Sequence, residues 1–327
     1  MSNITIESVM LLTTYRCNLT CDFCFYEKEG MYNHFRTKDK RKEMTVDEFI
    51  DLVVNPLLTM GLKKVTLSGG EPLIKKDIVK LIKHIIGLDL DCRIQSNLTV
   101  NVDTILNDEE ILRNISLQTS IDGVREDHDL YRGAGSYDKT VNNLRRAIDF
   151  YNALNMIPSV HVNTVLTKQN IFKLIQHVED MIECGVRSLS FQHLTWDGPQ
   201  SPNPLTREQI GELLKVAHEA KKIALANGMK LKFFPFDVSS DRMDDLDTWY
   251  NTSKFLQWKG CDYIKTKLRV NSFGDVFSCI EEAVGNLKDN SMGEILSGTN
   301  YNDFKNYILN CGPRKECKRC CNLKTSV

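Results

Sequence analysis

The sequence predicts an α/β protein, in which a parallel sheet and its helices fill most of the chain and a smaller cysteine-rich region follows. Two observations lead to this prediction. Short apolar runs alternate with amphipathic stretches six times, and this alternation stops after about residue 240. Repeated units of strand then helix favour a parallel sheet with right-handed crossovers.

The expected strands are short runs of β-branched and aliphatic residues bounded by turn residues. A continuous parallel sheet needs such runs at regular intervals, separated by helices. The strands expected are Val9–Thr13, Lys64–Ser68, Cys92–Ser96, Ile115–Ser120, Val160–Leu166 and Ser188–His193, with a further strand at Leu231–Phe234.

The first expected helix begins at Thr45, where Thr45–Glu48 has the Ser/Thr-x-x-Glu form of a capping box. Apolar residues then recur at helical spacing until Gly61. Later amphipathic stretches show the same period. The further helices expected are Asp77–Ile86, Asp138–Tyr151, Asn170–Cys184 and Thr206–Asn227.

The pattern changes in the last part of the chain. The acidic stretch Asp241–Asp247 is typical of a solvated linker. Two short apolar runs then flank Asn271–Gly274, which predicts a β-hairpin. The hairpin strands expected are Leu268–Val270 and Val276–Ser278, and two short helices follow near Met292–Leu296 and Asp303–Leu309.

Composition excludes several classes of protein. The net charge of −1 gives no general attraction to nucleic acid or to an anionic membrane surface. No apolar run approaches the ~20 residues of a membrane span, and the first residues lack the features of a signal peptide. The eleven cysteines are clustered, which favours metal ligands over disulfides. We therefore expect a cytoplasmic protein without nucleic-acid or membrane partners.

The first cysteine cluster, Cys17, Cys21 and Cys24, has the spacing C-x3-C-x2-C and follows the first expected strand directly. Three thiolates on one loop can hold three corners of a 4Fe–4S cluster and leave the fourth iron open for a ligand. Zinc is the alternative, but it prefers four protein ligands in two paired C-x2-C units. The spacing therefore favours a cluster.

With the aromatic Phe23 before its last cysteine, this pattern resembles the signature of the radical S-adenosylmethionine (SAM) superfamily. The resemblance implies that Cys17, Cys21 and Cys24 ligate the cluster and that Phe23 packs near the cluster or the adenine. It also implies that an electron from the cluster breaks SAM to a 5′-deoxyadenosyl radical, which abstracts hydrogen from a substrate. The fold implied is a partial (β/α)6, TIM-like barrel over residues 5–240, in agreement with the six repeats.

Residues at later strand ends strengthen the resemblance. Gly69, Gly70 and Glu71 end the second strand and resemble the family's GGE segment, which binds the amino group of SAM. Glycines allow the main chain to approach a ligand closely. The alternative for the serine and asparagine matches is that they only cap the next helix. Weaker matches to contacts with the ribose and carboxylate of SAM are Ser96, Asn97, Ser120, Asp122 and Arg132.

A second cysteine set lies in the last part of the chain. Cys261 and Cys279 flank the expected hairpin as C-x12-G-x4-C, and Cys317 and Cys320 form a C-x2-C. This resembles the SPASM/twitch extension of radical SAM enzymes, and its short tail favours the twitch version, with one auxiliary 4Fe–4S cluster in residues 255–327. Structural zinc is the rival, because two-plus-two cysteine spacing suits zinc.

Cys311 and Cys321 are left over from this set. Either can replace one of the four ligands or donate hydrogen to a substrate radical, and we assign the hydrogen-donor role to Cys321. The alternative is that both are inert thiols beside the site.

The resemblance implies radical generation but hardly constrains the substrate. Our leading hypothesis is oxidation or epimerisation of a small polyol in natural-product biosynthesis, because the hairpin spacing and final C-x2-C resemble those of the butirosin-pathway aminocyclitol dehydrogenase. The alternative is maturation of a ribosomally made peptide by crosslinking or epimerisation. A non-catalytic iron–sulfur or zinc protein is a remote alternative. Either enzyme implies an external electron donor such as flavodoxin or ferredoxin.

Polar side chains on the fifth and sixth expected strands are candidates for substrate contact, although ordinary barrel interior explains them equally well. They are His161, Asn163, Gln192 and His193. The basic segment Met31–Glu43 fits a solvated loop better than a loop that covers an acidic substrate.

Overall fold

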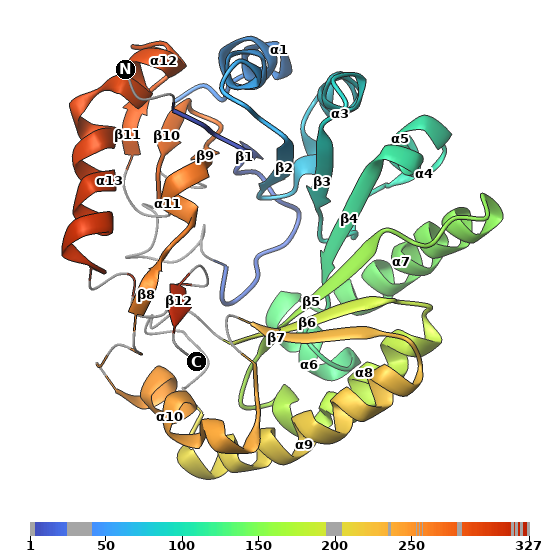
Figure 1. Ribbon diagram of the computed structural model, residues 1–327. Coiled ribbons are helices and arrows are strands. Elements are labelled where there is room, and N and C mark those ends of the chain that lie inside the picture. Colours follow the sequence, from blue (N-terminus) through green and yellow to red (C-terminus); the bar gives the residue numbers. More distant parts are fainter. Residues whose placement is uncertain are drawn as a thin grey trace.

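The computed structural model describes residues 4–24, 41–193, 205–234, 237–252, 254, 256, 258–279, 283–314, 317, 320 and 323–325. Ten strands of this part form one sheet, in the order β11-β10-β9-β1-β2-β3-β4-β5-β6-β7. Figure 1 shows that the sheet curves into an open barrel, with α3, α7, α8 and α9 along its outer face.

Strands β1 to β7 are parallel and pair in chain order. This order confirms the predicted α/β fold with a partial barrel, and the expected strand at the end of the repeats is the seventh strand of the sheet. The bounds are β1 Ser8–Thr14, β2 Lys64–Gly69, β3 Asp91–Gln95, β4 Ile115–Ser120, β5 Val160–Leu166, β6 Ser188–His193 and β7 Lys230–Phe234.

The crossover helices lie where the amphipathic stretches predict them. Thr45 makes the predicted capping box with Glu48, and Thr206 makes another with Gln209. The bounds are α1 Val46–Phe49, the π-helical turn η2 Ile50–Val54, α2 Asn55–Leu58, α3 Ile78–Gly87, α4 Asp103–Leu106, α5 Glu109–Asn114, α6 Arg125–Arg132, α7 Ser136–Ala153, α8 Leu174–Glu183 and α9 Arg207–Ala226, with 3-10 turns η3 Pro72–Ile74 and η4 Asn170–Lys173.

The two faces of the parallel sheet differ in polarity. In β4, Ile115 and Leu117 are buried, while Gln118 and Ser120 point to the opposite face and remain partly exposed. Strand β5 alternates in the same way. The apolar face packs against the helices as the main hydrophobic core. The inner face of the barrel is therefore polar, and the candidate functional site lies on it.

The C-terminal hairpin extends the same sheet beyond β1. Strand β9 pairs with β1 in parallel, and β10 and β11 follow antiparallel, which confirms the predicted hairpin. Apart from this sheet, β8 and β12 form a two-stranded ribbon. The division into residues 5–240 and 255–327 stays a prediction. The bounds are β8 Trp258–Cys261, α11 Tyr263–Thr266, β9 Lys267–Val270, β10 Asp275–Phe277, β11 Ala283–Asn286, α12 Met292–Ser297, α13 Thr299–Cys311 and β12 Leu323–Thr325.

The expectation of a solvated linker at Asp241–Asp247 is wrong. This stretch contains the 3-10 turn η5 (Ser240–Arg242) and the start of helix α10 (Met243–Asn251). Leu246, Trp249 and Tyr250 are buried on one side of α10, so the acidic residues occupy only its outer side. The acidic residues dominate the sequence pattern because two of these three apolar side chains come after them.

No helix among the described residues is long and apolar enough to cross a membrane.

We predict that Trp249→Ala lowers the free energy of unfolding by about 3–5 kcal/mol, because it leaves a large cavity where α10 packs. Trp249 is 1% exposed. Leu225→Ala is the control, since Leu225 on α9 is 80% exposed and its loss should change the free energy by about 0.5 kcal/mol or less. Urea denaturation measures both. Equal, small effects would contradict the packed helix.

Candidate active site

A cavity of about 320 Å³ lies at the carboxyl ends of the parallel strands, on the polar inner face of the sheet. Ligands of parallel barrels gather at this end. The cavity walls combine thiols, glycine main chain and side-chain carboxamides. The lining residues are Cys17, Leu19, Cys21, Phe23, Cys24, Ser68, Gly69, Gly70, Gln95, Ser96, Asn97, Gln118, Ser120, Arg132, Asn163, Val165 and Gln192.

The cysteine loop, residues 17–24, follows β1 and is folded by its own hydrogen bonds. The Leu19 N–H donates to Cys17 Sγ at 3.5 Å. The Cys24 N–H donates to the Cys21 carbonyl at 3.1 Å. These short-range bonds bring the three predicted cluster ligands to one wall of the cavity.

Helix α6 and the segment after β3 hold the cysteine loop in place. The Asp22 N–H donates to the Tyr131 carbonyl at 2.8 Å. Asn97 Nδ2 donates to Cys17 Sγ at 3.5 Å and to Asn18 Oδ1 at 3.0 Å. Asn97, one of the predicted SAM contacts, is therefore also a support for the first cysteine.

The three thiols of the cysteine loop are half-buried, and the Arg132 guanidinium lies near Cys21. Burial raises the pKa of Cys21 to about 11, and the Arg132 guanidinium opposes this rise. Arg132 forms an ion pair with the buried carboxylate of Asp122 and lies over the Phe23 ring, 5.7 Å from its centroid. A cationic neighbour stabilises thiolates, and thiolates are the form that binds metal. Asp122 itself lies behind Arg132, away from the cavity lining.

These groups fit the predicted iron–sulfur cluster. Three thiols share one wall, and no carboxylate or imidazole accompanies them among the described lining residues. Thiolates on one loop are the donors that hold a cluster with an open iron. Within the described ranges, no group of three or more Cys, His, Asp and Glu side chains is arranged to hold a single metal ion.

Gly69 and Gly70 occupy positions that other residues cannot take. Gly69 has φ +124°, and a Cβ there would lie 2.3 Å from the Thr14 carbonyl oxygen. A Cβ on Gly70 would lie 2.2 Å from the Arg16 carbonyl oxygen. Both contacts are to main chain, which cannot rotate away. The glycines therefore set how closely the chain after β2 approaches the start of the cysteine loop.

The Glu71 side chain points away from the cavity. Its carboxylate accepts hydrogen bonds from the Leu73 N–H at 3.0 Å and the Asn97 N–H at 2.8 Å. Burial raises the pKa of Glu71 to about 7, against the opposing effect of these donors and of Ser96. In this geometry the carboxylate connects the ends of β2 and β3 and leaves contact with the cavity to the main chain of Gly69 and Gly70.

Three further residues predicted to contact SAM line the cavity, and two of them also make local hydrogen bonds. Ser96, Asn97 and Ser120 all line the cavity. Ser96 Oγ also accepts from the Leu98 N–H at 3.0 Å, and Asn97 Oδ1 accepts from the Thr99 N–H at 2.8 Å. These bonds order the turn after β3 and do not cap the next helix, because α4 begins only at Asp103 and Val102 is its N-cap residue.

Two of the four predicted substrate residues line the cavity. Asn163 Nδ2 donates to Gln192 Oε1 at 3.2 Å, and Asn163 Oδ1 accepts from Ser190 Oγ at 2.8 Å. His161 continues this chain of polar contacts below the cavity lining, with Nε2 2.9 Å from Ser190 Oγ. His193 is fully buried on the opposite face of β6, where its Nδ1 lies 2.9 Å from the hydroxyl of Tyr250 on α10.

Gln118 is a cavity residue that the sequence reading missed. It lies two positions before Ser120 on β4 and so points to the same face. The alternation of side chains along a strand is the signal that could have found it. With Gln95, Asn163 and Gln192, it forms a row of four carboxamides on the neighbouring strands β3 to β6.

The second cysteine set comes together at the C-terminal ribbon. Burial raises the pKa of Cys317 to about 12, and the thiols of Cys279, Cys320 and Cys261 contribute to the rise. The Cys320 N–H donates to the Cys317 carbonyl at 3.1 Å, which closes the C-x2-C turn. Three of the four thiols pack against the small apolar cluster of Ile264, Phe304 and Ile308. The predicted auxiliary ligands are thus neighbours in space.

Cys311 and Cys321 are the two remaining cysteines of this region. Cys311 is exposed at the last position of α13. Cys321, predicted as a hydrogen donor, lies outside the described residues.

Comparison with known proteins identifies two regions. The family model of the radical SAM superfamily matches residues 11–181, more than half of the chain. The model of an iron–sulfur cluster-binding domain, SPASM, matches residues 261–321.

Two curated relatives and one solved structure match most of this chain at low identity. The tungsten-containing aldehyde ferredoxin oxidoreductase cofactor-modifying protein of Pyrococcus furiosus is 23% identical over 95% of this chain and 89% of its own. A probable GTP 3′,8-cyclase of Saccharolobus islandicus is 24% identical over 93% of this chain and 91% of its own. Streptococcus suis SuiB bound to S-adenosylmethionine has a TM-score of 0.68 at 18% identity, over 98% of this chain and 73% of that chain.

We predict that Gly70→Ala destabilises the protein by about 2 kcal/mol or more and weakens SAM binding, because the new Cβ collides with main chain. Gly293→Ala on α12 is the matched control, since a Cβ there meets nothing within 4 Å and alanine favours the helix. Chemical denaturation and equilibrium dialysis with SAM measure the two effects. A Gly70→Ala protein as stable as Gly293→Ala would contradict the close approach.

Proposed function

The chain belongs to the radical SAM superfamily, and we propose that it abstracts hydrogen from a C–H bond of a small polyol such as a sugar or an aminocyclitol. The proposed net reaction is oxidation or epimerisation. The observation that carries the proposal is the single cavity in which the cysteine loop, the glycine pair and a row of carboxamides face one another.

The family and its second domain imply a SAM-binding 4Fe–4S cluster and an auxiliary iron–sulfur cluster. We assign Cys17, Cys21 and Cys24 to the first. When bound, the cluster and SAM together supply a 5′-deoxyadenosyl radical that takes hydrogen from the substrate. In this assignment the main chain of Gly69 and Gly70 accepts the amino group of SAM, while Asn97, Ser96, Ser120 and Arg132 face its remaining polar groups.

The carboxamides support a substrate rich in hydroxyl groups. A carboxamide both donates and accepts hydrogen bonds, so a row of them suits hydroxyl or amide groups. Arg132 is the one charged side chain among the described lining residues, and the buried Asp122 carboxylate offsets its charge. A cavity with this distribution of charge favours a polyol over a multiply charged anion. The four carboxamides are Gln95, Gln118, Asn163 and Gln192.

The second cysteine set supports an oxidative outcome. We assign Cys261, Cys279, Cys317 and Cys320 as ligands of one auxiliary 4Fe–4S cluster. Such a centre can accept the electron that a substrate radical loses when the substrate is oxidised. Structural zinc in this set remains the rival and would instead favour a redox-neutral epimerisation.

A second candidate substrate is a ribosomally made peptide. The observation that favours it is the overall likeness to SuiB, which has also been solved bound to precursor peptide SuiA. Backbone amides of a peptide would satisfy the same carboxamides as the hydroxyls of a polyol. The proposal also includes an external electron donor, such as flavodoxin or ferredoxin, and a reducing, cytoplasmic location for the clusters.

We predict that Cys17→Ala abolishes formation of 5′-deoxyadenosine by the reconstituted, chemically reduced enzyme, because one cluster ligand is lost. Liquid chromatography of the products measures this. Cys184→Ala is the control, since Cys184 lies at the end of α8, away from the cavity, and should leave the product unchanged. Near-normal 5′-deoxyadenosine from Cys17→Ala would refute the assignment of the cysteine loop.

Isotope transfer tests the substrate class. Deuterated sugars and aminocyclitols are incubated with the reduced enzyme, in parallel with deuterated peptides, and 5′-deoxyadenosine is analysed by mass spectrometry. We expect deuterium from a polyol. Deuterium from peptides alone would replace the leading proposal with the second candidate.

A further inference from the structure

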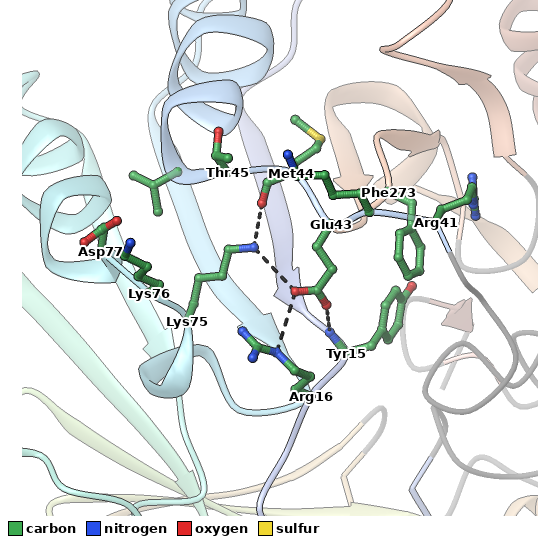
Figure 2. Close-up of a pocket in the computed structure, with 12 residues that line it drawn as sticks. Tyr15, Arg16, Arg41, Glu43, Met44, Thr45, Lys75, Lys76, Asp77 and Phe273 are labelled. Atoms are coloured by element: carbon green, nitrogen blue, oxygen red, sulfur yellow. Dashed lines mark hydrogen bonds and ion pairs between the residues drawn. The ribbon is translucent and has the colours of Figure 1, made fainter.

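Another cavity, of about 520 Å³, lies beside the cysteine loop, between the end of β1, the start of α1 and Phe273 (Figure 2). Its described lining carries five basic and two acidic side chains. None of them belongs to the predicted cluster or SAM contacts. Glu43 takes part in three of the four interactions that Figure 2 draws. The lining residues are Tyr15, Arg16, Arg41, Lys42, Glu43, Met44, Thr45, Val46, Lys75, Lys76, Asp77 and Phe273.

Glu43 binds the short stretch that leads from β1 into the cysteine loop. Thr14 Oγ1 donates to its carboxylate, at 2.8 Å from Oε1 and 2.9 Å from Oε2. The Tyr15 N–H donates to Oε1 at 2.9 Å. Thr14 Oγ1 in turn accepts from the Arg16 N–H at 3.1 Å. One carboxylate therefore orders the three residues that immediately precede Cys17.

The opposite side of this stretch contacts the glycine segment. The Gly70 N–H donates to the Thr14 carbonyl at 2.7 Å, and the Glu71 N–H donates to the Arg16 carbonyl at 2.8 Å. Because the main chains already touch at Gly70, residues 14–16 cannot shift without moving the glycines. A shift of the Glu43 carboxylate would therefore move both the start of the cysteine loop and the glycine pair.

Lys75 gives Glu43 a second, purely structural role. Lys75 Nζ lies 3.5 Å from Glu43 Oε2, and the lysine side chain is 7% exposed. The same ammonium donates to the Met44 carbonyl at 2.5 Å. A buried ammonium that loses its counterion is costly. An experiment on Glu43 must therefore separate the loss of this ion pair from the loss of the hydrogen bonds to Thr14 and Tyr15.

The segment around Glu43 also contacts the C-terminal hairpin. Residues 41–44, here the bridging segment, join the two cysteine-containing parts of the fold. Arg41 makes two hydrogen bonds to the Asp275 carboxylate, at 3.0 and 2.9 Å, and the Met44 N–H donates to the Ser272 carbonyl at 2.6 Å. Glu43 thus lies on a segment that is anchored to β10 and its turn, so its carboxylate is held in place independently of the cysteine loop.

We propose that Glu43 is a positioning residue for SAM binding. Its carboxylate fixes residues 14–16 and, through them, the Gly69–Gly70 main chain in the place that SAM requires. The inference rests on the proposed function, in which those glycines contact SAM. The Glu43 side chain is not among the lining residues of the SAM cavity. Glu43 therefore acts on SAM binding through the hydrogen bonds that its two carboxylate oxygens accept.

The test is Glu43→Gln, which keeps the shape but replaces one acceptor oxygen with a donor group. Equilibrium dialysis of the reconstituted protein measures the dissociation constant for SAM. We expect a rise of about tenfold or more, with iron content unchanged and a weaker effect of SAM on the electron paramagnetic resonance spectrum of the reduced cluster. Glu7→Gln is the matched control, because Glu7 precedes the opposite end of the same strand and its carboxylate pairs with Lys63 at the surface.

A double variant separates positioning from ion pairing. Lys75→Met in the Glu43→Gln background removes the unpaired ammonium and should restore the melting temperature but not the affinity for SAM. Recovery of SAM affinity in the double variant would show that Glu43 serves only as a counterion and would overturn the proposal. If Glu43→Gln alone does not fold, the double variant supplies the same comparison.

The outcomes also distinguish this inference from the proposed function. Wild-type protein that binds SAM, with a Glu43→Gln affinity within about twofold of it, removes the positioning role and leaves the proposed function intact. Wild-type reconstituted protein that does not bind SAM contradicts both.

Discussion

The contact between two stretches of main chain, at the ends of β1 and β2, is the constraint on which the site depends. Because Gly69 and Gly70 have no side chains, the chain after β2 can approach residues 14–16 as closely as the structure shows. This approach sets where the cysteine loop begins and where the glycine main chain faces the cavity. Glu43 and Glu71 then fix the two stretches from outside, and neither carboxylate lines the cavity.

Polarity explains why the candidate site is inside the barrel. The outer face of the sheet is apolar and is covered by helices, so the inner face is free to carry carboxamides, hydroxyls and thiols. Its one charged side chain within the described lining, Arg132, is neutralised by a carboxylate behind it. Buried charge is tolerated only when it is paired in this way. The C-terminal region that carries the second cysteine set belongs to the same sheet, because β9 pairs with β1.

Much of this arrangement could be predicted from the sequence, because strands, cysteine spacing and glycine pairs are local patterns. The seven parallel strands and the C-terminal hairpin follow from periodicity, and the four later thiols follow from their spacing. Long-range partners could not be predicted in this way. Nothing near Glu43 indicates that it reaches Thr14 and Tyr15, and nothing in the GGE segment shows that the Glu71 side chain turns toward Asn97. Helix α10 was missed because acidic residues precede its buried Trp249 and Tyr250.

The most direct test of the central claim, two iron–sulfur clusters held by two separate cysteine sets, is the iron and sulfide content per chain after anaerobic reconstitution. Wild type is compared with the double variant Cys261→Ala/Cys279→Ala. Two 4Fe–4S clusters predict about eight irons in wild type and about four in the variant. About four irons in both proteins, with zinc bound only by wild type, would contradict the auxiliary cluster and remove the electron acceptor from the proposed oxidation.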